Sequence, residues 1–265
     1  MQLRTVRLIA GFSPTIIASI AGEYRQAFGV WALYTKKMVC FANSIKKHEE
    51  SLGSCVAGRE ILAKGFGDWI RPVSARPSGE ISATERLCED GAAAEVLDVI
   101  TVPLLHPQPK DHQAENHVIA NDRRWVRGRK AAWRHVLAAL DTPSGPLWTN
   151  GYSTRNGLND HIPEFVAAKL PRSLYLIRPD ALSIIVRTEP VFDSLPKRRV
   201  RAAFSCNKID YVWAVTDPVI KEEYMLGKEG AYCINDAVLC ISLGEPFNGS
   251  AYKLVATVLT PDMGA

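Results

Sequence analysis

The sequence lacks the short motifs by which many enzymes are identified. It contains no G-x-S-x-G, no Walker-type glycine loop and no dinucleotide-binding glycine loop, and "GLND" and "SLGEP" are too short to cradle a phosphate. No cysteine and histidine stand in a pairing typical of nucleophilic catalysis. These absences leave no reaction to assign, and they favour a non-catalytic protein that needs no cofactor.

Zinc-site and membrane signals are absent as well. The six cysteines are scattered without C-x-x-C or zinc-ribbon spacing, so we expect reduced, mostly buried thiols in a cytoplasmic protein. Near the N-terminus an apolar stretch is interrupted by Ser13 and Pro14, which makes it a poor signal peptide and too broken to span a membrane. We therefore expect no membrane contact.

The composition that remains is that of a globular protein. The 265 residues are 47% hydrophobic and 23% charged, which suits one large domain or two small ones. The net charge of +4 permits an anionic partner such as DNA or RNA without requiring one. A first strand, "MVCFAN", begins at Met38, so we interpret residues 1–37 as an appended or mis-started extension; a targeting peptide is the alternative.

Strand patterns dominate the rest of the chain. Trp133, Val136 and Leu137 lie on one face of a short predicted helix, and Asp217 precedes Pro218 as the cap of another. The capping-box pattern "SATE" predicts a third helix from Ser82. Strands are expected near residues 38–43, 55–62, 68–73, 96–105, 173–186 (broken by "RPDA"), 198–205, 209–216, 237–243 and 252–259.

One hairpin is predicted to the residue. A two-residue turn at Asn207-Lys208 pairs Cys206 with Ile209, and with them Phe204 with Tyr211, Ala202 with Trp213 and Val200 with Val215. All these apolar residues then share one face, and a slip by one residue would mix the faces. The opposite face presents Lys197, Arg199 and Arg201, which form a short basic ladder.

The stretch "GDWIRPVSARPSGEIS" is read in the same way. Trp69, Arg71 and Val73 share one face of a strand, and we expect Trp69 to pack rather than to bind a ligand. Because Pro72 cannot donate to a β-ladder, the strand is expected to lie at an edge or to end there.

The order of the motifs resembles a known family. "CVAG", "WIRPVSARPSGEIS", "EVLDVITVPL", "QAENHVI", "NGLNDHIP", "SLYLIRPDALSI", "VTDPVIKEEY", "SLGEPF" and "YKLVA" follow one another as in the bacterial dual OB-containing domain family, from about residue 38 to 259. The resemblance implies two OB-like β-barrels and brings no assigned reaction. We therefore expect a mainly β protein with a few helices (α+β) and two small OB-like barrels in tandem, the first with helical insertions over residues 38–188 and the second over 189–265.

OB-like barrels commonly bind oligonucleotides or oligosaccharides on a sheet face and its loops, so the resemblance favours nucleic-acid binding by fold analogy. Phosphate contacts need exposed lysine or arginine, which the basic ladder supplies, and a second basic stretch, "DRRWVRGRK", surrounds Trp125. A charged face that protects an edge strand from aggregation is the alternative interpretation. The candidate nucleic-acid-binding residues are Lys197, Arg199, Arg201, Arg123, Arg124 and Arg127, with Arg71 and Arg76 as weaker candidates.

Two other functions stay open. The protein is a subunit that docks a protein partner through an exposed sheet edge or the 106–117 loop, or it is a metal-dependent enzyme at His106, His112, Glu115 and His117. The spacing of these four residues matches no common metal motif, which favours a proline-rich loop with incidental histidines and no metal. Asp217 is interpreted as a helix cap rather than a catalytic acid, and strand alternation predicts that Lys253 is exposed.

Overall fold

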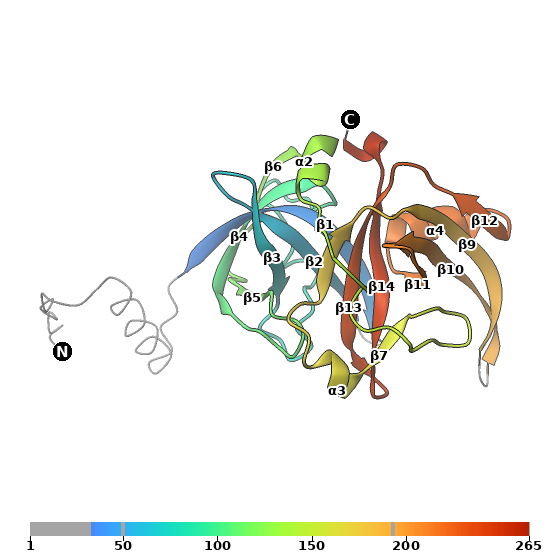
Figure 1. Ribbon diagram of the computed structural model, residues 1–265. Coiled ribbons are helices and arrows are strands. Elements are labelled where there is room, and N and C mark those ends of the chain that lie inside the picture. Colours follow the sequence, from blue (N-terminus) through green and yellow to red (C-terminus); the bar gives the residue numbers. More distant parts are fainter. Residues whose placement is uncertain (1–32, 49–50, 192–193, 265) are drawn as a thin grey trace, which may run out of the picture.

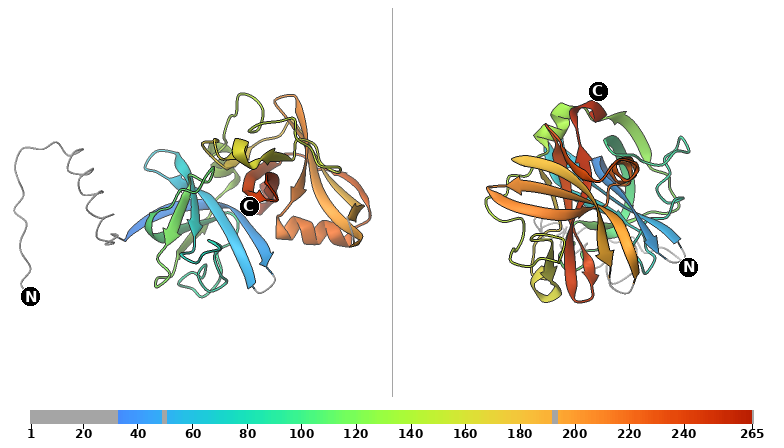
Figure 2. Two further views of the ribbon diagram at one scale, coloured as in Figure 1. Left: turned by 90° about the horizontal axis from the view of Figure 1, so that it is seen from below. Right: turned by 90° about the vertical axis from the view of Figure 1, so that its right-hand side faces the viewer.

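The computed structural model describes residues 33–48, 51–191 and 194–264, and most of them are strand. Figure 1 shows two β-sheets side by side, the first formed by the N-terminal half of the described chain and the second by the C-terminal half. The views in Figure 2 show the same arrangement from below and from the side. The predicted mainly β class with two OB-like barrels is confirmed. The predicted extension up to residue 32 lies outside the described residues.

The first barrel has the strand order β1-β2-β3-β5-β4-β6, and β1 also pairs with β4, so the order returns to its first strand. The pairing of β3 with β5 is parallel, whereas the other pairings are antiparallel. Residues 34–37, predicted to belong to the extension, instead pair with β4 as the start of β1. The strands are β1 (Tyr34–His48), β2 (Ser51–Ile61), β3 (Phe66–Val73), β4 (Asp98–Pro107), β5 (Asn116–Ile119) and β6 (Val126–Lys130).

The second barrel repeats this order. The strand predicted over 173–186 is split at residues 178–180 into β8, which pairs with β13, and β9, which pairs with β10. From β9 the order runs through β10 and β11 to β14 and β13, with β11 and β14 parallel, and it returns to β8. The two parts of the split strand, β8 and β9, thus take the place that β1 has in the first barrel. The strands are β7 (His161–Pro163), β8 (Leu174–Ile177), β9 (Ala181–Val191), β10 (Ser194–Cys206), β11 (Ile209–Val215), β12 (Gly230–Cys233), β13 (Val238–Phe247) and β14 (Ser250–Leu259).

These pairings bear on the division into domains. The boundary predicted between residues 188 and 189 falls inside β9, and both β8 and β9 pair with strands of the second sheet. We therefore propose a boundary before β8 rather than after residue 188.

The hairpin prediction is confirmed for the described pairs. Cys206 pairs with Ile209, Phe204 with Tyr211 and Ala202 with Trp213, and both turn residues have positive φ, 54° at Asn207 and 63° at Lys208. The prediction for Pro72 is half correct. Although β3 lies inside the sheet between β2 and β5, its pairing with β2 ends at Ile70, so no neighbour there needs a donor from Pro72.

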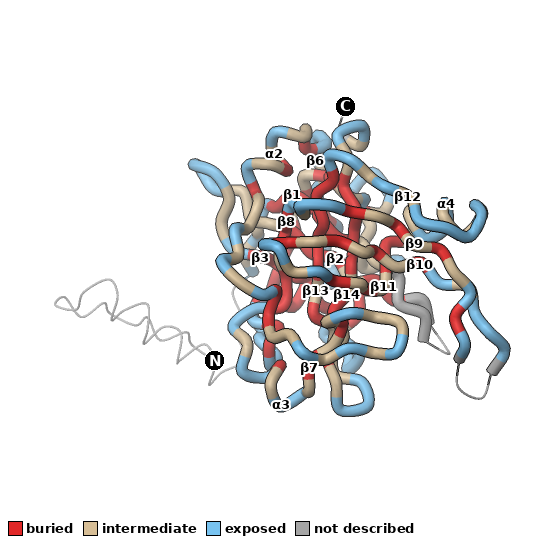
Figure 3. Tube along the Cα trace, turned by 45° about the vertical axis from the view of Figure 1, so that its right-hand side comes forward, coloured by how far each residue is buried: buried red, intermediate tan, exposed pale blue. Residues whose placement is uncertain are grey.

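The helices are short. Asp217 caps α4 as predicted, because one carboxylate oxygen accepts from Val219 N at 2.9 Å and from Ile220 N at 3.2 Å. α4 lies at the outside of the second sheet (Figure 3); none of its residues is fully buried, but Ile220, Tyr224 and Met225 pack partly buried against the core of the second barrel. The α-helices are α2 (Trp133–Ala138), α3 (Glu164–Ala167) and α4 (Pro218–Leu226), and a 3₁₀-helix η1 (Pro261–Gly264) follows β14. Within the described ranges, none of them is long and apolar enough to cross a membrane.

The helix predicted from Ser82 is wrong. The reciprocal bonds of a capping box do form, from Ser82 N to Glu85 Oε2 at 2.8 Å and from Glu85 N to Ser82 Oγ at 3.3 Å. The chain then makes only turns, because Leu87 and Cys88 form bridges with Ala93 and Trp125. The capping-box pattern therefore predicts the two local hydrogen bonds correctly, but no helix follows them.

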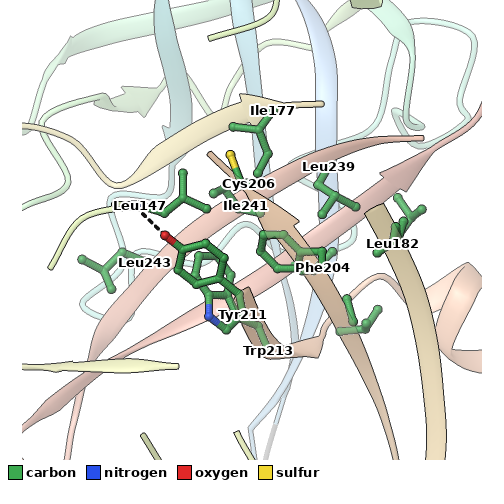
Figure 4. Packing of buried hydrophobic residues seen from close by; sticks show 14 of the residues in the cluster. Leu147, Ile177, Leu182, Phe204, Cys206, Tyr211, Trp213, Leu239, Ile241 and Leu243 are labelled. Atoms are coloured by element: carbon green, nitrogen blue, oxygen red, sulfur yellow. Dashed lines mark hydrogen bonds between the residues drawn. The ribbon is translucent and has the colours of Figure 1, made fainter. Parts of the chain in front are cut away.

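The apolar side chains form three clusters. One fills the interior of the first barrel, with Met38, Val56 and Ile70, and another fills the interior of the second, where Phe204, Tyr211 and Trp213 pack together (Figure 4). The third lies between the barrels and takes residues from both. This shared core joins Phe41, Ala57 and Trp69 to Leu176, Cys240 and Leu259, so the prediction that Trp69 packs is confirmed.

Candidate functional site

The basic ladder is only partly free. Lys197 and Arg199 are exposed. Arg201 is not, because its Nε and Nη2 donate to the two carboxylate oxygens of buried Glu189 at 2.6 and 2.9 Å. Burial raises the pKa of Glu189, but hydrogen bonds from Arg201 and Arg187 outweigh it and hold the pKa below its usual value. This geometry does not favour the predicted phosphate contact by Arg201.

The second basic stretch is also divided. Arg123 is exposed, and Arg124 is exposed while Nη1 donates to Thr84 O at 3.1 Å. Arg127 donates to Ala93 O at 2.8 Å and lies 3.5 Å from the buried carboxylate of Asp98, which ties it to its own barrel. Trp125 is fully buried in the first barrel and offers no stacking surface.

The weaker candidates Arg71 and Arg76 lie between the barrels. Arg71 is buried and ion-paired with Glu115, with 3.1 Å between Nη2 and Oε1, and it donates to Ser173 Oγ of the segment that leads into β8 at 2.8 Å. Its Nη1 is covered and has no hydrogen-bond partner in the described part of the chain. Arg71 thus links the two barrels.

A cleft of about 500 Å³ opens beside these arginines. β1, β2, β3 and β5 line it from the first barrel, together with the turns that follow β3 and β4, and β8, β13 and β14 line it from the second. Its volume falls within the range of roughly 300–1,000 Å³ typical of small-molecule sites. The buried aliphatic part of the lining, the aliphatic floor, consists of Ala42, Ala57, Val73, Leu174, Leu243 and Ala256.

Two tight turns carry cations to the rim of the cleft. In the turn after β3, Ser74 N donates to Gly79 O and Gly79 N to Arg76 O, and the φ of +67° at Gly79 favours glycine there. Arg76 uses Nε and Nη2 for Ser74 Oγ, Glu80 O and Glu85, which leaves its Nη1 without a partner among the described residues. In the turn after β4, Lys110 and Gln113 exchange backbone hydrogen bonds, and the exposed Lys110 Nζ pairs with Glu245 of β13 at 2.9 Å.

The four candidate metal ligands of the 106–117 loop do not converge. His112 is buried with Nε2 3.0 Å from Gly244 O of β13, and Glu115 pairs with Arg71. His117 Nδ1 lies 2.6 Å from Tyr34 Oη, where burial lowers the pKa of the imidazole, and His106 lies at the surface with Nδ1 3.0 Å from Pro107 O. Over the described ranges no group of three metal-ligating side chains is found. The loop docks on the second barrel of its own chain through His112 and Lys110, which leaves less of it open for the predicted docking of a protein partner.

One residue was placed wrongly by strand alternation. Lys253 was predicted to be exposed, but it is buried inside the second barrel, with Nζ 2.8 Å from Thr149 O and 5.4 Å from the centre of the Trp213 ring. Burial lowers the pKa of Lys253 to about 7, although the nearby Asp160 raises it. The prediction failed because segment 147–160 covers this mouth of the barrel.

The fold and the cleft define a class of protein, two OB-like barrels that hold a shared cleft between them. The chain belongs to the dual OB-containing domain family, whose model matches residues 36–258. No curated protein and no solved structure matches the chain. The sequence signal for the cleft was present in the segments that carry the resemblance, because "CVAG", "WIRPVSARPSGEIS", "QAENHVI", "SLGEPF" and "YKLVA" all contribute lining residues.

Proposed function

We propose that the protein is a non-catalytic binding protein for nucleic acid, and that the ligand occupies the cleft between the barrels. The observation that carries the proposal is which strands and turns of the first barrel form the walls of the cleft. The first barrel contributes β2, β3 and the turn between β4 and β5. The outer face of the second and third strands and the loop between the fourth and fifth are the elements with which OB folds bind oligonucleotides.

The chemistry of the walls supports a binding role. An aliphatic floor with a few fixed polar groups is typical of sites that orient a ligand. Arg71, buried on the cleft side of β3, keeps one nitrogen without a partner, and Arg76 keeps another at the rim. The unpaired Arg71 Nη1 favours a ligand with acceptor groups, because a buried donor without a partner costs about 1–3 kcal/mol, and the exposed Arg76 Nη1 is open to the same ligand.

The other exposed cations keep a secondary place in the proposal. Lys197, Arg199, Arg123 and Arg124 are exposed on faces that do not line the cleft, so they would contact only a long strand that leaves it. We place the protein in the cytosol, where its six free thiols would stay reduced.

Fluorescence anisotropy with labelled single-stranded DNA and RNA, over a salt series, tests the proposal. Binding should weaken with salt, because phosphate contacts release counterions. The double variant Arg76→Gln, Lys110→Gln should bind more weakly, whereas the matched variant Lys197→Gln, Arg199→Gln should bind nearly as well as the parent. The reverse order would move the site to the basic ladder, and no binding at low salt would refute the nucleic-acid proposal.

A second candidate function, docking of another protein, is favoured by two exposed phenylalanines. Phe165 is 69% exposed and Phe247 66%, on α3 and at the end of β13, and Glu164 N donates to Gly249 O between these segments at 3.0 Å. Exposed apolar side chains close together often mark protein contacts. Self-association or binding to a purified partner that is lost in Phe165→Ser, Phe247→Ser, with cleft binding unchanged, would support this function.

A further inference from the structure

We propose that the cleft holds a single nucleotide unit that ends in a phosphate monoester, with the base against the aliphatic floor and the phosphate between Arg76 and Lys110. This inference rests on the proposed function and narrows its ligand. The same chemistry occurs in a free mononucleotide and in the phosphorylated end of a strand. Size, lining and charge each point to this unit.

The size of the cleft limits the length of the ligand. OB folds that track a strand have site sizes of about 4–16 nucleotides and bind along an open groove. A cleft of about 500 Å³, with walls from two barrels, is instead of the size that holds one small molecule. A longer strand would enter it only by its end.

The lining argues against a run of stacked bases. Strand-binding OB folds stack successive bases on aromatic side chains. Among the described residues that line this cleft none is aromatic, whereas Val73, Leu174 and Leu254 offer aliphatic surface from both barrels. A single flat base can pack between aliphatic walls, as flipped bases do in their pockets.

Amide groups lie next to the aliphatic floor. Gln113 and Asn116 are buried and line the cleft, and Asn116 Nδ2 donates to Gln113 Oε1 at 3.3 Å. Asn116 Oδ1 has no partner within the part of the chain that the structure describes. Asparagine and glutamine amides are the groups that bind the edge of a base, since they donate and accept side by side. These amides suit a base better than a plain aliphatic chain.

The rim suits one phosphate group. Arg76 and Lys110 are the exposed cations that line the cleft in the described structure, too few for a run of phosphates. Lys110 is held by Glu245, but this pair is solvent-exposed, so an incoming phosphate displaces the carboxylate at little cost. A phosphate monoester carries a charge of about −1.5 to −2 at pH 7, more than an internal diester, and therefore gains more from two cations.

Isothermal titration calorimetry on the full chain tests the inference with the four 5′-mononucleotides and their nucleosides. At least one mononucleotide should bind, and its nucleoside about a hundredfold more weakly, because the contacts of the phosphate with both cations are lost. Arg76→Gln and Lys110→Gln should each weaken the mononucleotide about tenfold, while Arg123→Gln, an exposed arginine outside the cleft, should not. Circular dichroism of each variant checks the fold, and Lys110 lies on an exposed turn where folding is least affected.

Two further ligands separate the sources and the competing outcomes. A short oligonucleotide with a 5′-phosphate should bind more tightly than the same strand without it if strand ends are recognised. Binding of mononucleotides alone would assign the site to free nucleotides and would replace the nucleic-acid strand of the proposed function by a free nucleotide. Both results support the inference. Equal binding of both oligonucleotides, sensitive to Arg76→Gln, would uphold the proposed function and overturn the inference. If octanoate bound and no nucleotide did, both the proposed function and the inference would be overturned, and the cleft would be a site for an apolar ligand.

Discussion

The two barrels share one strand order and differ in what fills and surrounds them. The interior of the first is almost wholly aliphatic around Trp125, whereas the second contains stacked and edge-on aromatic rings and a buried lysine. In the first barrel the turn after β4 reaches out to the second, while the corresponding connection between β13 and β14 is short. One topology thus carries a long connection that reaches the other barrel in the first and a short connection in the second, and strands of both barrels line the cleft.

Segment 147–163 is joined to the second barrel by strand pairing and by hydrogen bonds. This segment crosses from α2 towards β8 and fills the space between β11 and β14, where Leu158 pairs with Val212 and β7 with β14. Leu147 N donates to Tyr211 Oη at 3.0 Å, as the dashed line in Figure 4 shows, and Trp213 Nε1 donates to Asn159 O at 2.9 Å.

The largest effect is expected from removing the central ring of the second barrel. Trp213→Ala should lower the free energy of unfolding by about 3–5 kcal/mol, because a large buried side chain leaves a cavity. Since the barrels share a core, guanidinium unfolding followed by circular dichroism should show one shifted transition. Two transitions, of which only one moves, would mean that the barrels unfold separately. Val126→Ala, at a site 45% exposed on the first barrel, serves as control and should change stability by less than about 0.5 kcal/mol.

The next effect concerns the buried charge pair of the first barrel, Arg71 and Glu115, both of which hydrogen-bond to Ser173 of the second barrel. Arg71→Met should cost about 3 kcal/mol, because it leaves the buried carboxylate of Glu115 without its counter-ion. The double variant Arg71→Met, Glu115→Met should recover part of this loss in the same unfolding measurement. If the double variant were less stable than Arg71→Met, the loss in Arg71→Met could not be attributed to an unpaired buried carboxylate.

The free energy of unfolding should depend on pH through Lys253, the buried lysine of the second barrel. The pKa of Lys253, lowered by burial to about 7, lies below its unfolded value near 10.5, so the unfolded state binds more protons between these values. The contribution of Lys253 to stability is therefore full above pH 10.5 and is lost as the pH falls towards 7, by up to about 1.4 kcal/mol per unit. The stability difference between the parent and Lys253→Met should rise with pH over this window. A flat difference would place the charged ammonium in the folded barrel.

The smallest effect is expected on the basic ladder. Lys197→Ala and Arg199→Ala should each change stability by less than about 0.5 kcal/mol, since both side chains are exposed and no described ion pair holds them. Thermal unfolding of both variants provides the measurement. A loss above about 1 kcal/mol in either would show a structural role that the exposed geometry does not reveal.

Local patterns predicted the parts of the fold that depend on neighbouring residues. The 200–215 hairpin and the Asp217 cap follow from alternation and turn chemistry within a few residues, and the strand broken at "RPDA" appears as β8 and β9. The cleft could not be predicted in this way, because its lining extends from Ala42 to Ala256 and meets only when the barrels pack.

The errors have the same cause. Lys253 has the alternation of an exposed residue, yet segment 147–160, about a hundred residues earlier, covers it. Arg201 belongs to a basic run, yet a carboxylate on the adjacent strand neutralises it. Charge and periodicity in the sequence report on the strand to which a residue belongs. Whether the side chain is buried or ion-paired depends on segments that are distant in the sequence or lie on another strand.

The shared core has a consequence for the order in which the molecule is made. Ala256 and Leu259, in the last strand, pack against residues of β1 and β2. The first barrel emerges first during synthesis, and domains generally fold as they emerge. Its outer face, with Phe41 and Trp69, therefore stays uncovered until β13 and β14 have been added, so ribosome-bound chains lacking β14 should be the species that most need a chaperone.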